Sequence, residues 1–541
     1  MRLRSRGWRR AVSSAFVAVC AASAASSAAP LPVARNAILI SIDSLRADHL
    51  SLYGYPRETT PALTALLERR GGTVYRNATA VSPSCHPSHT AMLTGLYPQE
   101  VGVPWCGEDL IVKWSDFEEP EDLAGIERYQ ESLRNQPPAL RQKKLSAVRN
   151  WLAIPESQET LGGLLRANGF HSAGAVAIWT LAARFGYGTG FERYVDAMPE
   201  YYGPASLAWL LRDVMGSQRR QSAAATIDAA ISTISEFAPG SGTGAAEGPG
   251  REGRFFLFLN LADTHVPYDG RGETLPGESS EDRAAMESRW ARRYGRDGWS
   301  RARREMSGPD GLLLDRYDLA IRHTDREIAR LVDALAARGL LDDTLIVITS
   351  DHGDSFGQHP YLAANRARRL FFEHSLYVWE ETQHVPLIVL APGMPAGARY
   401  REVNVSQVDL KPTILAALGL AGVGEPGPGS DLAMLREEPR AVYFLTFGRG
   451  QPGLLSQTRL DFPRYIGLRR GSLKFFVDRE RFRDAKEGSC FLFDLASDPD
   501  ELVNLCGERP AEALQLRSIL VDWYRHSTSV RTPAGRRASP R

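Results

Sequence analysis

The sequence AILISI at Ala37–Ile42 runs into an aspartate, and the sequence TLIVIT at Thr344–Thr349 runs into Ser-Asp-His-Gly-Asp. Short apolar, β-branched runs of this kind are typical of buried strands in a parallel sheet. Two further runs, Arg254–Leu261 and Pro386–Leu390, have the same character. Helical patterns lie between the runs, and the longest extends from about Leu312 to Ala337. This alternation predicts an α/β fold with a mostly parallel sheet flanked by helices.

The length of the chain and a change in its pattern predict two domains. A chain of 541 residues exceeds the size at which a single hydrophobic core stops growing. Beyond about residue 440 the sequence turns to short alternating strands and a final helix at Ala511–Tyr524, which predicts a smaller C-terminal α+β subdomain. We expect a main domain over residues 36–435, this subdomain over residues 440–525 and a disordered tail over residues 527–541.

Residues 1–29 have the three parts of a secretory signal peptide. Five arginines precede an Ala-rich apolar run, and small residues follow. The run is too short and too interrupted by serine to predict a membrane span. The surroundings of Cys20 match a lipoprotein signal poorly, so we expect no lipid anchor there. The sequence therefore predicts a periplasmic or secreted protein whose mature chain has no transmembrane anchor.

Export also bears on the remaining cysteines. Cys490 and Cys506 flank a short segment near the C-terminus. In an oxidising compartment they could form a disulfide, and the alternative is a pair of buried free thiols.

Composition and charge exclude several classes of protein. Apolar residues make up 43% of the chain and charged residues 24%, which excludes a disordered or collagen-like protein. The formal net charge is +1, so the chain lacks the basic excess typical of nucleic-acid binding. No lysine lies between Lys144 and Lys411. No pattern in the sequence fixes the oligomeric state.

Two of the predicted strands deliver acidic side chains. Asp43 follows the first strand, and Asp351 and His352 follow the strand that begins at Thr344. Ligands bind at the carboxyl ends of the strands in open α/β sheets. Two carboxylates and an imidazole at one sheet edge suit a divalent cation. Each carboxylate alone could equally be a turn or helix-cap residue, so the prediction of a metal site rests on their combination.

Between these strands lie residues whose side chains could bind an anion or react with one. Cys85 precedes a predicted helix, whose N-terminal amides would favour a negative charge. His89 lies one helical turn further on, and we expect it to reach the side chain of Cys85. His265 follows the strand at Arg254–Leu261 and could donate to an oxyanion or protonate a leaving group.

Seven motifs along residues 36–505 together resemble the sulfatase family of the alkaline phosphatase superfamily. In chain order they read ILISIDSLRADHLSLYGY, CHPSHTAMLTGLYP, DTHVPY, LDDTLIVITSDHGD, WEETQHVPLIV, VDLKPTIL and FDLASDPDELVNL. The resemblance implies an alkaline-phosphatase-like fold, a sulfatase-like catalytic domain over residues 36–435 and hydrolysis of sulfate esters. It further implies a small-molecule or glycan ester as the substrate.

The resemblance also implies a metal bound by Asp43, Asp351 and His352. Ser44 takes a position that is Asp in many members of the family, and we include it among the candidate ligands. Calcium is the usual ion in sulfatases, and magnesium or manganese would also suit such ligands.

The same resemblance assigns the reacting groups. Cys85 matches the cysteine that the family oxidises to formylglycine, whose hydrate attacks sulfur or phosphorus. His265 and His374 fall near positions where the family binds substrate. The family's oxidation motif is Cys-x-Pro-Ser-Arg, whereas the fifth residue here is His89, so conversion of Cys85 to formylglycine stays open.

The lysines that usually hold the sulfate are missing. One of the two positions corresponds to Ala177, and both fall within the lysine-free stretch. We therefore expect histidines to serve as the donors: His265, His374 and, as a further candidate, His359.

Three functions remain open from the sequence. The first is an exported metal-dependent hydrolase that cleaves sulfate esters by attack of a nucleophile derived from Cys85. The second is a phosphodiester or phosphonate monoester hydrolase of the same superfamily, because both substrates present a tetrahedral oxyanion. The third is a non-catalytic, sulfatase-like binding protein that keeps the fold and the metal.

Overall fold

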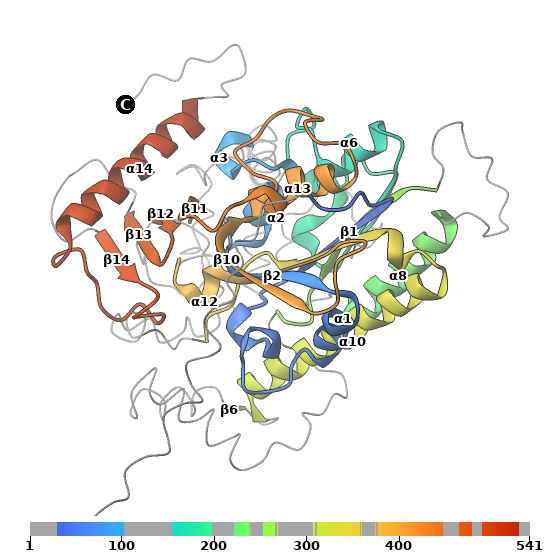
Figure 1. The fold of residues 1–541 in the computed structure, drawn as a ribbon, viewed down its shortest axis with the longest axis horizontal. Helices are drawn as coiled ribbons and strands as arrows, with labels where there is room; N and C mark the ends of the chain where they lie inside the picture. Colours follow the sequence, from blue (N-terminus) through green and yellow to red (C-terminus); the bar gives the residue numbers. More distant parts are fainter. Residues whose placement is uncertain are drawn as a thin grey trace, which may run out of the picture.

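The computed structural model describes most of the two sheets and the helices around them (Figure 1). The described residues are 30–101, 154–196, 221–237, 253–265, 268, 307–308, 311–356, 359, 374, 377–446, 465–478 and 490–529. The predicted signal peptide at residues 1–29 lies outside them. Across the described residues, no helix has both the length and the apolar composition needed to span a membrane.

A large sheet forms the centre of the molecule. Its strands are, in spatial order, β10 (Ala398–Ser406), β2 (Gly72–Thr79), β9 (His384–Leu390), β8 (Thr344–Ser350), β1 (Asn36–Ile42), β5 (Phe255–Leu261), β3 (His171–Val176) and β4 (Arg193–Val195). Strands β8, β1, β5, β3 and β4 pair in parallel, as do β10 and β2. The predicted α/β fold with a mostly parallel sheet is therefore confirmed.

One predicted strand runs in the opposite direction. Pro386–Leu390 was expected to be a parallel strand, but β9 pairs antiparallel with both β8 and β2. Every residue of β9 after His384 is buried, so its apolar run reads the same in either direction. Burial on both faces accounts for the apolar composition, and composition does not reveal the strand's direction.

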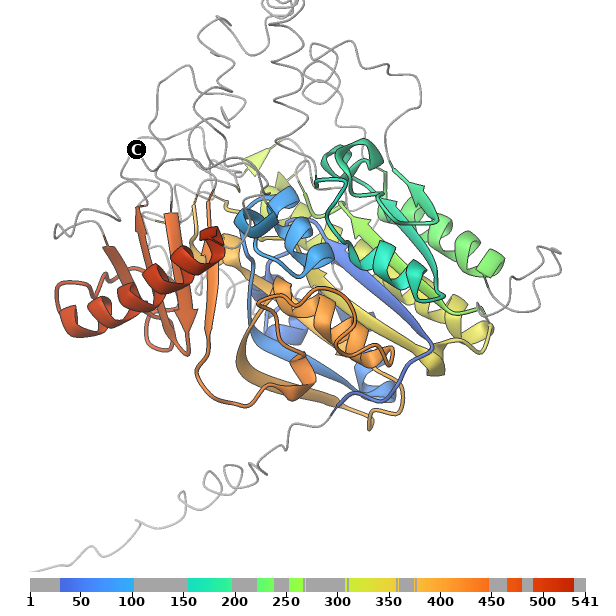
Figure 2. The same ribbon diagram turned by 90° about the horizontal axis from the view of Figure 1, so that it is seen from above.

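The two faces of the sheet are covered by different helices (Figures 1 and 2). On one face lie α1 (Pro61–Arg70), α8 (Ala223–Phe237) and α10 (Leu313–Ala337), and on the other α2 (Cys85–Thr94), α6 (Leu161–Ala167) and α13 (Leu410–Ala417). Alternate residues of β1 serve the two cores: Ile38 and Ile40 pack toward α10, and Ala37 and Leu39 toward α2. Because β1 is buried throughout, its ends are held firmly between the two layers.

The C-terminal region forms a second, smaller sheet. Its strands β11 (Ala441–Leu445), β12 (Tyr465–Arg470), β13 (Leu473–Asp478) and β14 (Cys490–Asp494) are antiparallel in that order, and α14 (Pro510–Ser529) packs against them. This is the predicted α+β arrangement, and Figure 2 shows it beside the main sheet. The domain boundaries themselves stay predictions.

The end of α14 differs from the sequence prediction, and the state of the two cysteines decides a question that the sequence left open. Helix α14 extends to Ser529, so residues 527–529 are helical and not part of a disordered tail. Residues 530–541 lie outside the described part of the chain. Cys490 and Cys506 form a disulfide with a Cα–Cα distance of 6.3 Å, which decides between the two alternatives.

Short elements complete the described fold. They are α3 (Pro98–Val101), α12 (Glu380–Gln383), the hairpin β6 (Ser307–Gly308) and β7 (Gly311–Leu312), and the 3-10 helices η1 (Ala47–His49), η2 (Ser51–Tyr53), η5 (Trp179–Leu181), η6 (Ala183–Phe185), η7 (Leu341–Asp343), η8 (Gln407–Asp409) and η9 (Leu432–Met434).

Candidate active site

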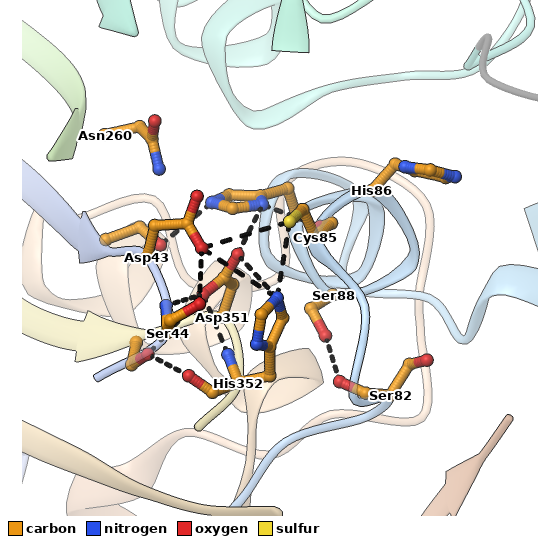
Figure 3. A network of polar contacts seen from close by, with 12 residues as sticks. Asp43, Ser44, Ser82, Cys85, His86, Ser88, Asn260, Asp351 and His352 are labelled. Atoms are coloured by element: carbon orange, nitrogen blue, oxygen red, sulfur yellow. Dashed lines mark hydrogen bonds and ion pairs between the residues drawn. The ribbon is translucent and has the colours of Figure 1, made fainter. Parts of the chain in front are cut away.

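The candidate site lies where β1 and β8 end. Ile42 pairs with Ser350 in the parallel register, so the next residues, Asp43 and Asp351, leave neighbouring strands at the same edge. Figure 3 shows both carboxylates directed toward the side chains of Cys85 and His352. The convergence of Asp43, Asp351 and His352 that the sequence predicted is present in the structure.

The turn after β1 holds these carboxylates in place. Asp351 Oδ1 accepts hydrogen bonds from the backbone N–H of Ser44 at 3.1 Å and of His352 at 2.8 Å. The hydroxyl of Ser44 donates to Asp43 Oδ1 at 3.1 Å. Ser44 itself has φ +61°, an uncommon value for a residue other than glycine. The Tyr317 hydroxyl donates to its carbonyl at 2.7 Å and so stabilises this conformation.

The imidazole of His352 presents Nε2 to the centre of the site. Its Nδ1–H donates to the carbonyl of Gly353 at 2.7 Å, which leaves the lone pair on Nε2. Nε2 lies 3.3 Å from Cys85 Sγ, 3.5 Å from Asp351 Oδ2 and 3.9 Å from Asp43 Oδ1. Burial lowers the pKa of His352 to about 4, so the ring is neutral near pH 7.

Cys85 is the first residue of helix α2. Its side chain is buried, and Sγ lies 3.9 Å from Asp43 Oδ1. The sequence places it there because Ser84, in an extended conformation, ends the preceding loop and α2 begins at the next residue. The thiol therefore faces both carboxylates from the positive end of a helix dipole.

These four side chains fit a divalent cation. One ligand atom from each of Asp43, Cys85, Asp351 and His352 lies within 4.8 Å of all the others, and all four residues are buried. Asp351 Oδ2 accepts no hydrogen bond within the described part of the chain. Burial raises the pKa of Asp351 to about 6, which shows how unfavourable its charge is in the protein alone. A cation among these atoms would offset that cost.

Two further imidazoles lie beside this centre. The ring of His374 stacks on His352 at a centroid distance of 4.3 Å, and the ring of His265 meets His374 edge-on at 4.9 Å. His374 Nδ1 lies 3.5 Å from Asp354 Oδ1. Burial acts to lower the pKa of His374, but the carboxylate of Asp354 outweighs it and the pKa is raised. The site thus combines four side chains that could hold a metal ion with an imidazole that can carry positive charge.

The chain is similar in sequence to known proteins, and this similarity identifies its family. The family model named Sulfatase matches residues 35–420, which is most of the chain. The chain belongs to the sulfatase family. Arylsulfatase K of Mus musculus is 32% identical over 221 residues, which cover 40% of this chain and 36% of that protein. The match thus spans about a third of the length of this curated relative.

Solved structures share the fold of this sulfatase-family chain at low sequence identity. One, determined in complex with its substrate D-glucosamine-2-N,6-O-disulfate, is 17% identical, with a TM-score of 0.56 over 91% of this chain and 98% of that chain. The phosphonate monoester hydrolase of Agrobacterium radiobacter is 18% identical, with a TM-score of 0.53 over 91% and 96% of the two chains. At these identities the likeness concerns the fold alone.

His89, which departs from the oxidation motif of the sulfatase family, does not lie where the sequence predicted. Its Nδ1–H donates to the backbone carbonyl of Cys85 at 2.7 Å, and its Nε2 accepts from the Ser41 hydroxyl at 2.9 Å. Both ring nitrogens are therefore engaged elsewhere, and the prediction that His89 reaches the Cys85 side chain is wrong. A residue four positions along a helix meets the backbone carbonyl first, because that carbonyl points along the helix axis. Burial lowers the pKa of His89 to about 3, so it carries no charge at neutral pH.

His359, the third candidate donor, has a different neighbour. Its ring stacks on Trp379 at a centroid distance of 3.9 Å. Trp379 belongs to an apolar cluster that otherwise contains mainly residues of the C-terminal sheet. This contact gives His359 a packing partner beside the C-terminal sheet.

Sequence reasoning missed the residues that support the site from behind. Asp354 Oδ2 accepts from the Tyr268 hydroxyl at 2.8 Å, and the Asp354 carbonyl accepts from buried Arg46 at 3.1 Å. Tyr317 donates to the turn at Ser44 from near the start of α10. Asp354 and Arg46 each lie within one of the seven sulfatase-like motifs, so the sequence contained a signal for both residues. Tyr317 occupies an apolar position of a helix, where its pattern matches an ordinary core residue.

Proposed function

We propose that this protein is an exported, metal-dependent hydrolase that cleaves sulfate esters with a nucleophile derived from Cys85. The observation that carries the proposal is the position of Cys85 Sγ, 3.3 Å from His352 Nε2 and 3.9 Å from Asp43 Oδ1 at the start of α2. A nucleophile in this position approaches an ester whose oxyanion is held against the same centre.

Asp43, Asp351 and His352 would hold the cation, with Ser44 as a further candidate ligand. Calcium is the ion we propose, and magnesium or manganese are the alternatives. When bound, the cation would withdraw charge from the reacting group and its nucleophile. The backbone N–H groups on Asp351 Oδ1 keep that carboxylate oriented without protonating it.

His265 and His374 would supply the donors that lysines supply elsewhere in the family. An ester transferring its sulfuryl group needs donors on the non-bridging oxygens and a proton for the departing alcohol. Asp354 favours the charged form of His374 and orients its ring, so His374 suits the first task. His265 meets the ring of His374 edge-on and suits the second.

The reaction would then transfer the sulfuryl group to residue 85 and release the alcohol, which takes a proton from an imidazole. If Cys85 is first oxidised to formylglycine, the attacking atom is an oxygen of its hydrate. The substrate we propose is a sulfate ester of a small molecule or a glycan. One structural neighbour was solved with a sulfated glucosamine as its substrate, which supports the glycan class.

A phosphonate monoester or phosphodiester hydrolase is the second candidate function. One observation favours it: a phosphonate monoester hydrolase shares the fold. The described site has imidazoles where a doubly charged substrate would need more cations. A singly charged phosphonate or diester therefore suits this site better than a phosphate dianion.

Parallel assays on an aryl sulfate, an aryl phosphodiester and an aryl phosphonate test the proposal. We expect turnover of the sulfate to be the fastest, to depend on a divalent cation, and to be lost in Cys85→Ala. Faster turnover of a phosphorus ester would establish the second function. Absence of turnover on all three by metal-loaded protein would favour the non-catalytic binding protein. Mass spectrometry of the Cys85 peptide, run alongside, identifies thiol or formylglycine.

A further inference from the structure

Sulfur and nitrogen donors gather on one side of the candidate metal centre. Cys85 Sγ lies 3.3 Å from His352 Nε2, and a ring nitrogen of His374 lies within 4.8 Å of Cys85 Sγ and of a ring nitrogen of His352. On the other side lie the carboxylates of Asp43 and Asp351 (Figure 3). The centre therefore presents two different donor sets that share Cys85 and His352.

The donor types do not match those of a hard cation while residue 85 is a thiol. Calcium takes six to eight oxygen ligands, whereas this group offers sulfur, nitrogen and two carboxylates. Zinc takes four ligands, and cysteine sulfur, histidine nitrogen and carboxylate oxygen are its usual donors. Sulfur in the donor set selects for softer ions at the expense of calcium and magnesium.

The spacing of the atoms also suits a small tetrahedral ion. In a tetrahedral zinc site, neighbouring ligand atoms lie about 3.3–3.8 Å apart, given zinc–ligand distances near 2.0–2.3 Å. The distance from His352 Nε2 is 3.3 Å to Cys85 Sγ and 3.5 Å to Asp351 Oδ2. The Asp43 carboxylate lies slightly further away, at 3.9 Å from both Cys85 Sγ and His352 Nε2. Small side-chain movements would bring all four within bonding distance of one ion.

Each imidazole has an outer partner of the kind that metal-binding histidines use. His352 donates through Nδ1 to the Gly353 carbonyl, and Nδ1 of His374 lies beside Asp354. The Tyr268 hydroxyl in turn holds Asp354. Outer contacts of this kind fix the ring orientation and leave the other nitrogen available to an ion.

We propose that, while Cys85 is a thiol, this centre is a zinc site formed by Cys85, His352 and the two carboxylates, with the ring of His374 stacked on His352 as a supporting residue. Binding forms a zinc–sulfur bond and breaks the S–H bond, and the thiol proton leaves to solvent. Because zinc then occupies the sulfur that the proposed reaction uses, the zinc form is a resting state. The inference shares its residues with the proposed function and does not depend on which ester is cleaved.

Metal titration of the full-length chain in its thiol form tests this inference. Co²⁺ serves as the optical probe, because thiolate ligation gives a sulfur-to-metal charge-transfer band, and Zn²⁺ and Ca²⁺ then compete for the site. We expect that band in the wild type, tighter binding of Zn²⁺ than of Ca²⁺, and release of a proton on Zn²⁺ binding. Cys85→Ser should remove the band and weaken Zn²⁺ binding by at least about 100-fold while Ca²⁺ binding persists.

Further variants separate ligation from general damage. His374→Gln should weaken Zn²⁺ binding by about 10–100-fold, the range measured for residues that support a metal site. His171→Gln is the matched control, because His171 lies at the start of β3 and pairs with Glu192, and it should change nothing. If Cys85→Ser fails to fold, the smaller Cys85→Ala takes its place, with a thermal melt as the check.

The outcomes are distinct from those of the ester assays. Zn²⁺ binding of equal strength in wild type and Cys85→Ser, or a Co²⁺ complex without the charge-transfer band, would overturn the zinc site. Either result would leave ester hydrolysis untouched. Conversely, a protein that cleaves no ester but shows the sulfur-dependent band would sustain the zinc site without the proposed reaction.

Discussion

The active centre and the junction between the two sheets both bury carboxylates, but different basic groups surround them. At the junction, Lys474 Nζ lies 2.9 Å from Glu380 and 2.8 Å from Glu501, and Arg469 lies 3.2 Å from Glu380. We call these four residues the junction cluster. Burial acts against ionisation of Glu380, yet Lys474 and Arg469 outweigh it and lower its pKa to about 2. Lysine and arginine thus favour the ionised form of Glu380 within the protein.

Around Asp351 in the active centre, the nearby basic side chains are imidazoles. His352 and His89 lie 3.5 Å and 3.7 Å from Asp351 Oδ2, and burial lowers their pKa values to about 4 and 3. These rings are neutral near pH 7, and the pKa of Asp351 rises to about 6. The two regions therefore differ in the cations that the protein itself supplies: lysine and arginine at the junction, and imidazoles around Asp351, among which only His374 has a raised pKa in the described part of the chain.

The largest effect that we expect comes from removing the charge of one carboxylate in the active centre. Asp351→Asn keeps an oxygen for the two backbone N–H groups but removes the charge that a cation needs. We expect kcat/KM to fall by at least about 10³-fold, since the metal's contribution to the reaction is lost. The melting temperature of the metal-free protein should stay equal or rise, because a buried charge is gone. A clear fall in that temperature would contradict the comparison.

Removing a cation from the junction cluster should instead lower the stability of the protein and change its turnover little. Lys474 is fully buried between two carboxylates, so Lys474→Met leaves both without their shared partner. We expect a loss of about 3–5 kcal/mol in the free energy of unfolding, measured by urea denaturation. Turnover per folded molecule should change little. A variant that unfolds normally but loses turnover would place the cluster in the reaction.

Loss of a donor tests whether imidazoles replace the missing lysines. We expect His265→Ala to lower kcat/KM by about 10²–10³-fold, the scale for a positioned donor in the transition state. Stability should stay near that of the wild type. Near wild-type turnover on every active ester would mean that His265 is only structural.

Chelation tests the active centre without changing a residue. If a cation binds the native state, saturating it at about 100 times its Kd adds about 2.7 kcal/mol to stability. EDTA should therefore lower the melting temperature of the wild type and leave that of Asp351→Asn unchanged. Equal shifts in both proteins would locate the bound ion elsewhere.

The smallest expected effect concerns the pH range of the junction. Burial raises the pKa of Glu501 to about 7. A raised folded-state pKa means that the stability from this group is complete below its unfolded pKa and is lost as the pH rises through about 7. We expect the wild type to lose on the order of 1–3 kcal/mol between about pH 5 and pH 8, and Glu501→Gln to lose less. Urea denaturation at both pH values provides the measurement, and identical losses would contradict the assignment.

The sequence predicted the half of the site that comes from strand ends. Asp43, Asp351 and His352 follow buried strands directly, so strand pairing alone brings them together. The position of His89 could not be predicted in the same way, since its partner Ser41 lies on a strand of the neighbouring layer. Spacing along a helix fixes the face of a residue but not which atoms of another element meet it.

Neither the junction cluster nor the direction of β9 could be predicted from the sequence, and the reasons are related. Lys474 and Glu380 are 94 positions apart, and their segments read as an ordinary strand and an ordinary helix start. Only the packing of the second sheet on the first brings them into contact. The direction of β9 depends on which neighbours it pairs with, and its apolar run is equally suitable in either direction.

The place of β8 in the sheet sets a time limit on access to Cys85. The thiol is buried against His352, which lies 267 positions later in the chain. At a synthesis rate of about 5–20 residues per second, roughly 13–50 s pass between translation of the two residues. Until β8 is synthesised and pairs with β1, His352 does not cover the thiol. Folding therefore covers the thiol, and we expect modification of Cys85 to be slower on the folded protein than on an unfolded or unfinished chain.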